Sequence, residues 1–311
     1  MSASYVIESD LSEKQIEADV AKYFGWCAWG LPFDLRDVDE PLTGADKLSN
    51  VTVPIYAQFK KSTGLRRPTA PLLSRRANES PLQDIRRFRA LHDLPNDPAL
   101  FFQLRKKASG ASDLQHNVLL EHHKPPISYA IYVAPLYLDY AEYCRDLFRH
   151  PRFRDDPWYW EKTELLSDWR MRAWLSRFDL QPFLRGHVSI PPHCRVSDHH
   201  HHYAYSLRGD SITWHSGEVV DPGSSRLSDF MSRRTRDLLS PGYELPSPEQ
   251  CIDLVRGNLA SADLAGRILE GDGPVAQLQA YGRWLWREHG IRQLLLLGRR
   301  DDLEKVRSLR G

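Results

Sequence analysis

The segment Val51–Lys61 constrains the fold more than any other part of the chain. Its apolar residues recur at every second position: Val51, Val53, Ile55, Ala57 and Phe59. Because side chains alternate between the two faces of a β-strand, the segment predicts a strand that carries Gln58 and Lys60 on one face. Pro54 cannot donate a ladder hydrogen bond, so we expect it near the start of the strand or at a sheet edge.

A helix is predicted upstream of this strand, from Ser12 to about Cys27. Ser12 and Gln15 have the spacing of a capping box, in which each side chain satisfies a free backbone N–H. Apolar residues follow at helical period: Ile16, Val20, Tyr23, Phe24 and Cys27. Glu17 lies at the edge of this stripe, and Glu13 is a second acid nearer the helix start.

The order of elements up to residue 135 predicts a mixed α/β sheet. Strands that alternate with helices favour this class. Residues 62–97 are interpreted as an insertion, with a helix from Ser80 to about His92. The other predicted elements are a short strand near Phe33–Arg36, a strand at Ala99–Arg105, a helix capped by Ser112 and Gln115 and running to about His123, and a buried strand at Ile127–Ala134.

The chain is predicted to have two parts, a core at residues 10–135 and an α+β accessory region at 136–311 that supplies specificity, partner binding or oligomerisation. In the second part, Val196–Val220 predicts a hairpin that turns at Arg208–Asp210. The tail predicts helices near Pro246 and over Gln277–Glu288, followed by the short apolar segment Ile291–Leu297.

Composition narrows the class of protein. Lys and Arg total 42 and Asp and Glu total 41, so a nucleic-acid partner would require a local basic patch rather than a high net charge. The four cysteines are far apart and form no Cys-x-x-Cys pair, which favours a reduced, cytoplasmic setting. We expect no signal peptide and no membrane partner, because no apolar run has the required length.

Four residues form a candidate divalent-metal site: Glu17 on the predicted helix, Asp46 in a Gly-Ala-Asp turn, and Gln58 and Lys60 on the strand. Mg²⁺ prefers hard oxygen ligands and keeps several waters, so few protein ligands suffice. Asp46 would be the principal ligand, with Gln58 and Glu17 completing the shell. Lys60 would stabilise charge that develops on a phosphate or position the attacking water.

In these residues the chain resembles the PD-(D/E)xK nuclease superfamily, closest to its restriction-endonuclease-like branch with the Mrr-like and Holliday-junction-resolvase-like enzymes. Ser62 also matches the frequent Lys-Ser ending of the strand motif. The chain departs from the pattern with Gly44-Ala45 in place of a proline before Asp46, and with Gln58 where glutamate is usual.

The resemblance implies an αβββαβ core and catalysis by Glu17, Asp46, Gln58 and Lys60 with Mg²⁺ or Mn²⁺. It implies a metal-dependent endodeoxyribonuclease, a phosphodiester hydrolase acting in restriction or antiphage defence. DNA would be the substrate. A homodimer and a separate partner protein such as an ATPase are the expected assemblies.

A basic stretch adjoins the strand, since residues 58–107 carry a net charge of +8. Such a patch gives salt-dependent affinity for phosphates. Loop residues are the better candidates for phosphate contact: Lys61, Arg66, Arg67, Arg75 and Arg76. Arg86, Arg87 and Arg89 are equally well explained as a solvated helix face.

Other interpretations stay open. Each of the four site residues has an ordinary structural explanation, such as a helix-dipole carboxylate for Glu17 or a turn aspartate for Asp46. Gln58 removes one charge from the metal shell, so a catalytically silent module that binds nucleic acid or a partner is the alternative function. Gln115 is interpreted as a surface residue.

A third hypothesis is a zinc-stabilised interaction protein built on the imidazoles and thiol between His193 and His215.

Overall fold

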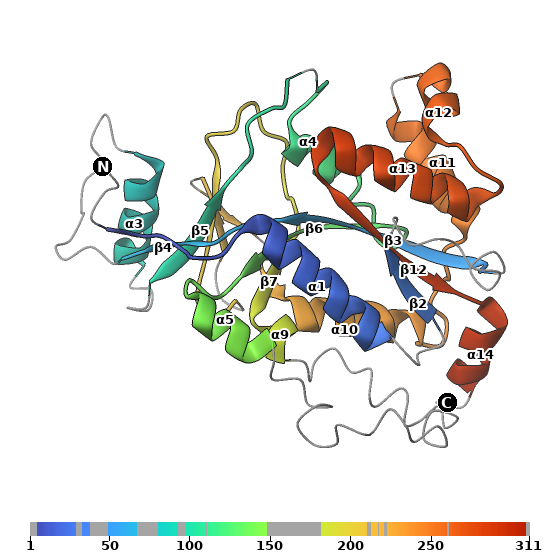
Figure 1. Cartoon of the computed structure of the whole chain (residues 1–311), viewed down its shortest axis with the longest axis horizontal. Helices are drawn as coiled ribbons and strands as arrows, with labels where there is room; N and C mark the ends of the chain where they lie inside the picture. Colours follow the sequence, from blue (N-terminus) through green and yellow to red (C-terminus); the bar gives the residue numbers. More distant parts are fainter. Residues whose placement is uncertain are drawn as a thin grey trace.

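The computed structural model describes residues 5–28, 33–37, 49–66, 80–92, 98–109, 111–147, 182–209, 213–216, 218–220, 223–259 and 261–308. These residues form a mixed α/β structure with two six-stranded sheets (Figure 1). Within these ranges, no helix combines the length and the apolar character needed to cross a membrane. Asp46 lies outside the described residues, and so do Arg67, Arg75 and Arg76.

The first sheet has the strand order β11-β7-β6-β3-β12-β2. Only β3 and β6 run parallel among its described pairs, and the remaining pairs are antiparallel. Its strands are β2 (Phe33–Asp37), β3 (Val51–Phe59), β6 (Tyr129–Pro135), β7 (His187–Ile190), β11 (Ser225–Arg226) and β12 (Arg292–Gly298). The sheet therefore takes strands from both sides of residue 135, and β12 lies between β3 and β2.

The second sheet has the order β1-β4-β5-β8-β9-β10 and is antiparallel. Its strands are β1 (Val6–Ile7), β4 (Thr63–Leu65), β5 (Ala99–Gln103), β8 (His202–Tyr205), β9 (Thr213–His215) and β10 (Glu218–Val220). Pairing of β8 with β9 confirms the predicted hairpin. The turn residue Gly209 has a φ of 68°, a left-handed conformation that glycine adopts without steric penalty.

Helices cover both faces of the first sheet, as Figure 1 shows with α1 and α10 on one side and α11 and α13 on the other. The helices are α1 (Glu13–Ala28), α3 (Pro81–Leu91), α4 (Gln115–Glu121), α5 (Tyr140–Leu147), α9 (Pro182–Arg185), α10 (Leu227–Leu238), α11 (Pro248–Asn258), α12 (Ala262–Ile268), α13 (Pro274–His289) and α14 (Arg300–Ser308).

The alternation of β3 decides which layer each side chain meets. Ile55 and Phe59 pack in the apolar cluster with α1 and α10, while Tyr56 packs in the cluster with α4, α11 and α13. All nine residues of the strand are buried. Period two places Gln58 and Lys60 on the same side as Tyr56, at the end of the strand.

Two local predictions are wrong. Pro54 lies inside a central strand and pairs with Leu295 of β12, although the β6 ladder begins only at the next residue, Ile55. Helix α4 begins after Leu114, which makes no side-chain cap, so Ser112 does not cap it. The capping box of α3, by contrast, forms as predicted between Ser80 and Gln83.

Candidate functional site

A cleft of about 710 Å³ lies where β3 and β5 end, against the first turns of α1 and the last turn of α13. Three of the four predicted site residues line it: Glu17, Gln58 and Lys60. They come from a helix and from the exit of a strand, so tertiary folding brings them together. The other lining residues are Glu13, Lys14, Phe59, Gln103, Arg105, Lys106, Ala108, Ala111, Asp113, Gln115, Trp286, Arg287, Glu288, His289 and Gly290.

The side-chain oxygen of Gln58 accepts no hydrogen bond from any described residue. The residue is 4% exposed, and its Nε2 donates to the carbonyl of Phe59 at 3.1 Å. Its Oε1 is buried and has no hydrogen-bond partner within the described part of the chain. A buried amide oxygen without a donor is unfavourable unless a cation, a water or a ligand completes it, and Mg²⁺ takes such oxygens.

Lys60 is the most deeply buried cation of the cleft, with 3% of its surface exposed. Burial lowers the pKa of its ammonium to about 8, the nearby Glu13 carboxylate opposes this shift, and Arg105 adds to it. The backbone N–H of Lys60 donates to Val133 of β6 at 2.9 Å, so the ladder continues past the end of β3 and fixes this position.

Glu17 is engaged by two residues of the C-terminal region. Its Oε1 accepts hydrogen bonds from Arg292 Nη1 at 2.6 Å and from Trp286 Nε1 at 3.2 Å. Arg292 also binds Asp37 Oδ2 through Nε at 2.7 Å. The resulting chain of two carboxylates and one guanidinium links α1, β12 and β2, and sequence reasoning missed both Asp37 and Arg292.

Glu13 is the lining acid that acts on Lys60. It favours the charged form of that lysine, and its Oε1 lies 3.5 Å from the backbone nitrogen of Lys61. Glu17 is already paired with Arg292. Glu13 is therefore the better candidate for the α1 carboxylate that is available to a ligand in this cleft.

The end of α13 closes the far wall of the cleft. Gly290 ends the helix in the left-handed conformation with a φ of 62°, where a side chain would be strained. Gln115 is 6% exposed and donates from Nε2 to the carbonyl of His289. The prediction that Gln115 is a surface residue is therefore wrong, because it joins α4 to the last turn of α13.

Most of the described basic stretch lies away from the cleft. Lys61 is half-buried and Arg66 is exposed at the end of β4, and neither belongs to the lining. The interpretation of the α3 arginines as a solvated face is wrong for Arg89, which is 8% exposed. Arg86 is half-buried and lies over the ring of Tyr5 at 4.2 Å. Arg105 and Lys106 are the residues of the stretch that join Lys60 at the cleft.

Ser62 has a structural role at the junction of the two sheets. Its hydroxyl is fully buried and lies 2.6 Å from the hydroxyl of Tyr205 on β8. It also donates to the carbonyl of Pro135 at the end of β6. Ser62 thereby ties the chain leaving β3 to both sheets.

The cleft thus combines a buried unsatisfied oxygen, a buried lysine and acids on a neighbouring helix, a set that suits a hard divalent cation next to a bound anion. The chain matches no protein family, no curated protein and no solved structure.

Proposed function

We propose that the protein is a divalent-metal-dependent endodeoxyribonuclease whose cleft hydrolyses phosphodiester bonds, with residues 10–135 related to the restriction-endonuclease-like core. One observation carries the proposal: Gln58 and Lys60 are both buried at the wall of one cleft, and Oε1 of Gln58 has no partner among the described residues. A buried lysine beside an unsatisfied oxygen is unfavourable for stability alone, and such sites are often functional.

The roles follow from chemistry. Gln58 would contribute its amide oxygen to Mg²⁺ or Mn²⁺, with carboxylates from Asp46 and from Glu13 or Glu17 as further ligands. The metal would polarise the scissile phosphate. Lys60 would place its ammonium against the charge that develops on the phosphate oxygens, where burial strengthens the interaction.

The lining is close to electrically balanced, with the basic residues Lys14, Lys60, Arg105, Lys106 and Arg287 and the acidic residues Glu13, Glu17, Asp113 and Glu288. A polyanion is then held by local contacts and by the metal rather than by a strong overall field. Restriction or antiphage defence in the cytoplasm, with a homodimer or a separate ATPase as partner, is the role that the family resemblance implies.

The test is cleavage of plasmid DNA by the purified full chain with Mg²⁺, with Mn²⁺ and with a chelator. Lys60→Met and Gln58→Ala should abolish metal-dependent cleavage, and Asp46→Ala should do the same. Lys22→Ala, on the exposed surface of α1, is the matched control and should cleave as the unaltered protein does. Undiminished cleavage by both Lys60→Met and Asp46→Ala would exclude this site.

The pairing of Glu17 with Arg292 favours a second candidate, a silent nuclease-like module that binds nucleic acid. A carboxylate held by a guanidinium is a weaker metal ligand, and Gln58 brings no charge. This candidate predicts salt-sensitive DNA binding that is the same with and without Mg²⁺. Tight Mn²⁺ binding by calorimetry, lost in Asp46→Ala, would exclude it.

A further inference from the structure

A second group of metal-ligand side chains lies apart from the cleft, in the segment after β7 and at the end of β9. His193 and Cys194 follow β7, and His215 is the last residue of β9. One ligand atom from each of the three lies within 4.8 Å of the other two. Among these atoms, Cys194 Sγ and His193 Nε2 lie 3.3 Å apart.

We infer that His193, Cys194 and His215 bind one zinc ion that cross-links the segment after β7 to the hairpin of the second sheet. The site is independent of the proposed nuclease cleft, which none of these three residues lines. Neutral imidazole and thiolate are the ligands that zinc prefers.

The spacing fits tetrahedral coordination. Two ligands at about 2.0 Å for nitrogen and 2.3 Å for sulfur, separated by a tetrahedral angle, lie about 3.5 Å apart. The contact between Cys194 Sγ and His193 Nε2 is already close to that spacing. The ligand atoms of the three residues lie no more than 4.8 Å apart. Rotation of the side chains can shorten these distances to the tetrahedral spacing.

The surroundings of the His193 and His215 imidazoles favour metal binding. His193 Nδ1 lies 2.9 Å from the Tyr203 hydroxyl, a partner of the kind that fixes the tautomer of a metal-bound histidine. His215 Nε2 is buried and has no hydrogen-bond partner within the described ranges. The two rings lie edge to face with centroids 4.4 Å apart.

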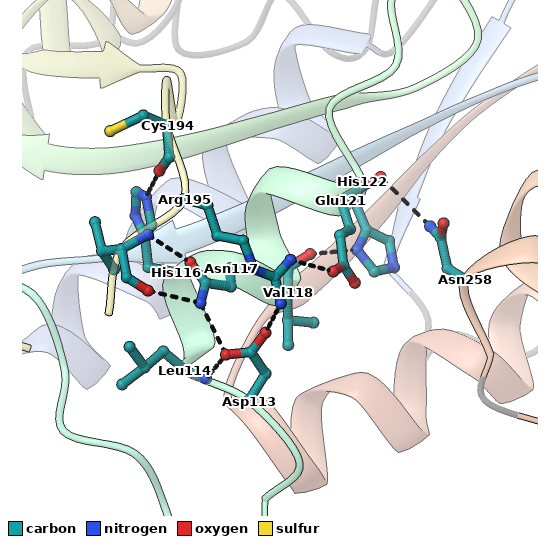
Figure 2. Close-up of polar contacts among 11 residues, drawn as sticks. Asp113, Leu114, His116, Asn117, Val118, Glu121, His122, Cys194, Arg195 and Asn258 are labelled. Atoms are coloured by element: carbon teal, nitrogen blue, oxygen red, sulfur yellow. Dashed lines mark hydrogen bonds and ion pairs between the residues drawn. The ribbon is translucent and has the colours of Figure 1, made fainter. Parts of the chain in front are cut away.

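The backbone that carries Cys194 is held in place by α4, as Figure 2 shows. His116 Nε2 lies 2.7 Å from the carbonyl of Cys194, and its Nδ1 lies 2.8 Å from the Tyr132 hydroxyl. Asn117 pairs with the backbone of Val196 through both its oxygen and its nitrogen, each at 3.0 Å. His116 thus has a partner at each nitrogen and supports the site without joining the ligands.

Arg195 anchors the same segment by charge, because it binds Glu121 Oε1 at 2.8 Å and also pairs with Asp113 (Figure 2). These contacts hold the backbone at Cys194 and at the two residues that follow it. The backbone of the thiol therefore needs little ordering when a metal arrives, and such preorganisation favours binding.

His201 is the residue placed to complete the shell. Its ring stacks on His215 with centroids 5.1 Å apart, and its Nδ1 is buried without a partner in the described part of the chain. Because its nitrogens fall outside the three-residue group, it would have to rotate toward the ion. Zinc sites with three protein ligands keep the fourth position for water, so the inference does not require His201.

The experiment measures zinc and cobalt binding by the full chain after chelation and metal readdition. We expect one zinc per chain by elemental analysis. Cobalt should give the intense near-ultraviolet band of a thiolate-to-cobalt charge transfer. Cys194→Ser should remove that band, and His215→Ala should weaken zinc binding by at least about 100-fold, since even residues behind the ligands are worth about 10- to 100-fold.

A double variant, His199→Ala with His200→Ala, is the matched control. These two residues belong to the run of four consecutive histidines at positions 199–202, lie outside the three-residue group, and can bind metal nonspecifically. It should keep both the stoichiometry and the cobalt band. The inference is overturned if this control loses the metal, or if Cys194→Ser and His215→Ala bind zinc as the unaltered chain does. The cobalt spectrum of the unaltered chain tests the inference even if a variant does not fold. If the unaltered chain binds cobalt without giving the charge-transfer band, the inference is overturned.

Discussion

Arg292 donates to Glu17 at 2.6 Å and so links the first residue of β12 to α1 across 275 positions of sequence. Arg292 Nε also binds Asp37 at 2.7 Å. The three side chains are only 13–20% exposed. If one side chain is removed, little water can reach the other two to replace the lost contacts.

Arg292→Met should therefore destabilise the protein. The variant removes the guanidinium that binds both Glu17 and Asp37 in a half-buried position, which costs roughly 2–3 kcal/mol of the free energy of unfolding. Urea denaturation measures the loss. The control is Arg299→Met, whose pair with Asp302 is 53% exposed on each side and should contribute only about 0–1 kcal/mol. Equal losses in the two variants would contradict the buried role of Arg292.

Lys60 gives the stability a pH dependence. Its folded pKa of about 8 lies below the ordinary 10.5, so the unfolded chain holds more protons between these values and stability rises with pH there. The Lys60→Met variant lacks this titration. Raising the pH from 8 to 10 should therefore stabilise the unaltered protein relative to Lys60→Met, by up to about 3 kcal/mol of the free energy of unfolding.

Urea denaturation in the presence of a chelator, at pH 7, 9 and 10, checks the Lys60 prediction. Lys106→Met is the matched control, because Lys106 lines the same cleft but is exposed to water in the folded state as well. A difference for Lys60→Met that stays constant over this range would show that the lysine is not buried as described.

Gln58→Glu should strengthen divalent-metal binding. The substitution replaces the unsatisfied amide oxygen by a charged oxygen of the same reach, and the affinity of such sites increases with ligand charge. We expect roughly tenfold tighter Mn²⁺ binding by calorimetry. Gln103→Glu adds the same charge at an exposed position of the cleft and should change the affinity much less. An equal gain in both variants would indicate a diffuse electrostatic effect and no ligand role for Gln58.

Ser62 and Tyr205 should be energetically coupled. Ser62→Ala leaves the buried Tyr205 hydroxyl without its 2.6 Å partner and should cost about 1–3 kcal/mol. Combining it with Tyr205→Phe should give less than the sum of the single effects, by at least about 0.5 kcal/mol. Ser308→Ala, at an exposed hydroxyl, should stay within about 0.5 kcal/mol. Strictly additive effects in the double-mutant cycle would show that the contact contributes nothing.

Asn117→Ala should loosen the segment that carries Cys194. Val196 loses both backbone partners, so its amide should exchange with solvent faster and the protein should lose about 1–3 kcal/mol. Zinc affinity should fall by roughly tenfold. Asn258→Ala removes a single 3.4 Å bond to Glu121 and is the control with little expected effect (Figure 2). Unchanged exchange at Val196 would contradict the anchoring role.

Several parts of the fold could be predicted because their signals are local. The alternation from Val51 to Phe59 predicted β3, and the capping pair Ser80 and Gln83 predicted the start of α3. The turn at Gly209 predicted the hairpin of β8 and β9. In each case the deciding contacts join residues close in sequence, so period and turn chemistry suffice.

Glu17, Gln58 and Lys60 line one cleft, while Asp46 lies outside the described residues, so the four-residue metal site stays a prediction. Sequence could place Gln58 and Lys60 on one strand face, because period two alone determines this. It could not show that Glu17 would be held by Arg292, or that Glu13 would act on Lys60, since partners on different elements are chosen by packing.

By itself, the sequence determined β3, the start of α3, the hairpin of β8 and β9, and the face of β3 that carries the polar pair. The tertiary structure decided the insertion of β12 between β3 and β2, the burial of Lys60, and the approach of His215 to Cys194. The physical reason is the range of the interactions. Backbone periodicity acts over a few residues, whereas strand pairing, burial and ligand convergence depend on segments that meet only when the chain is folded.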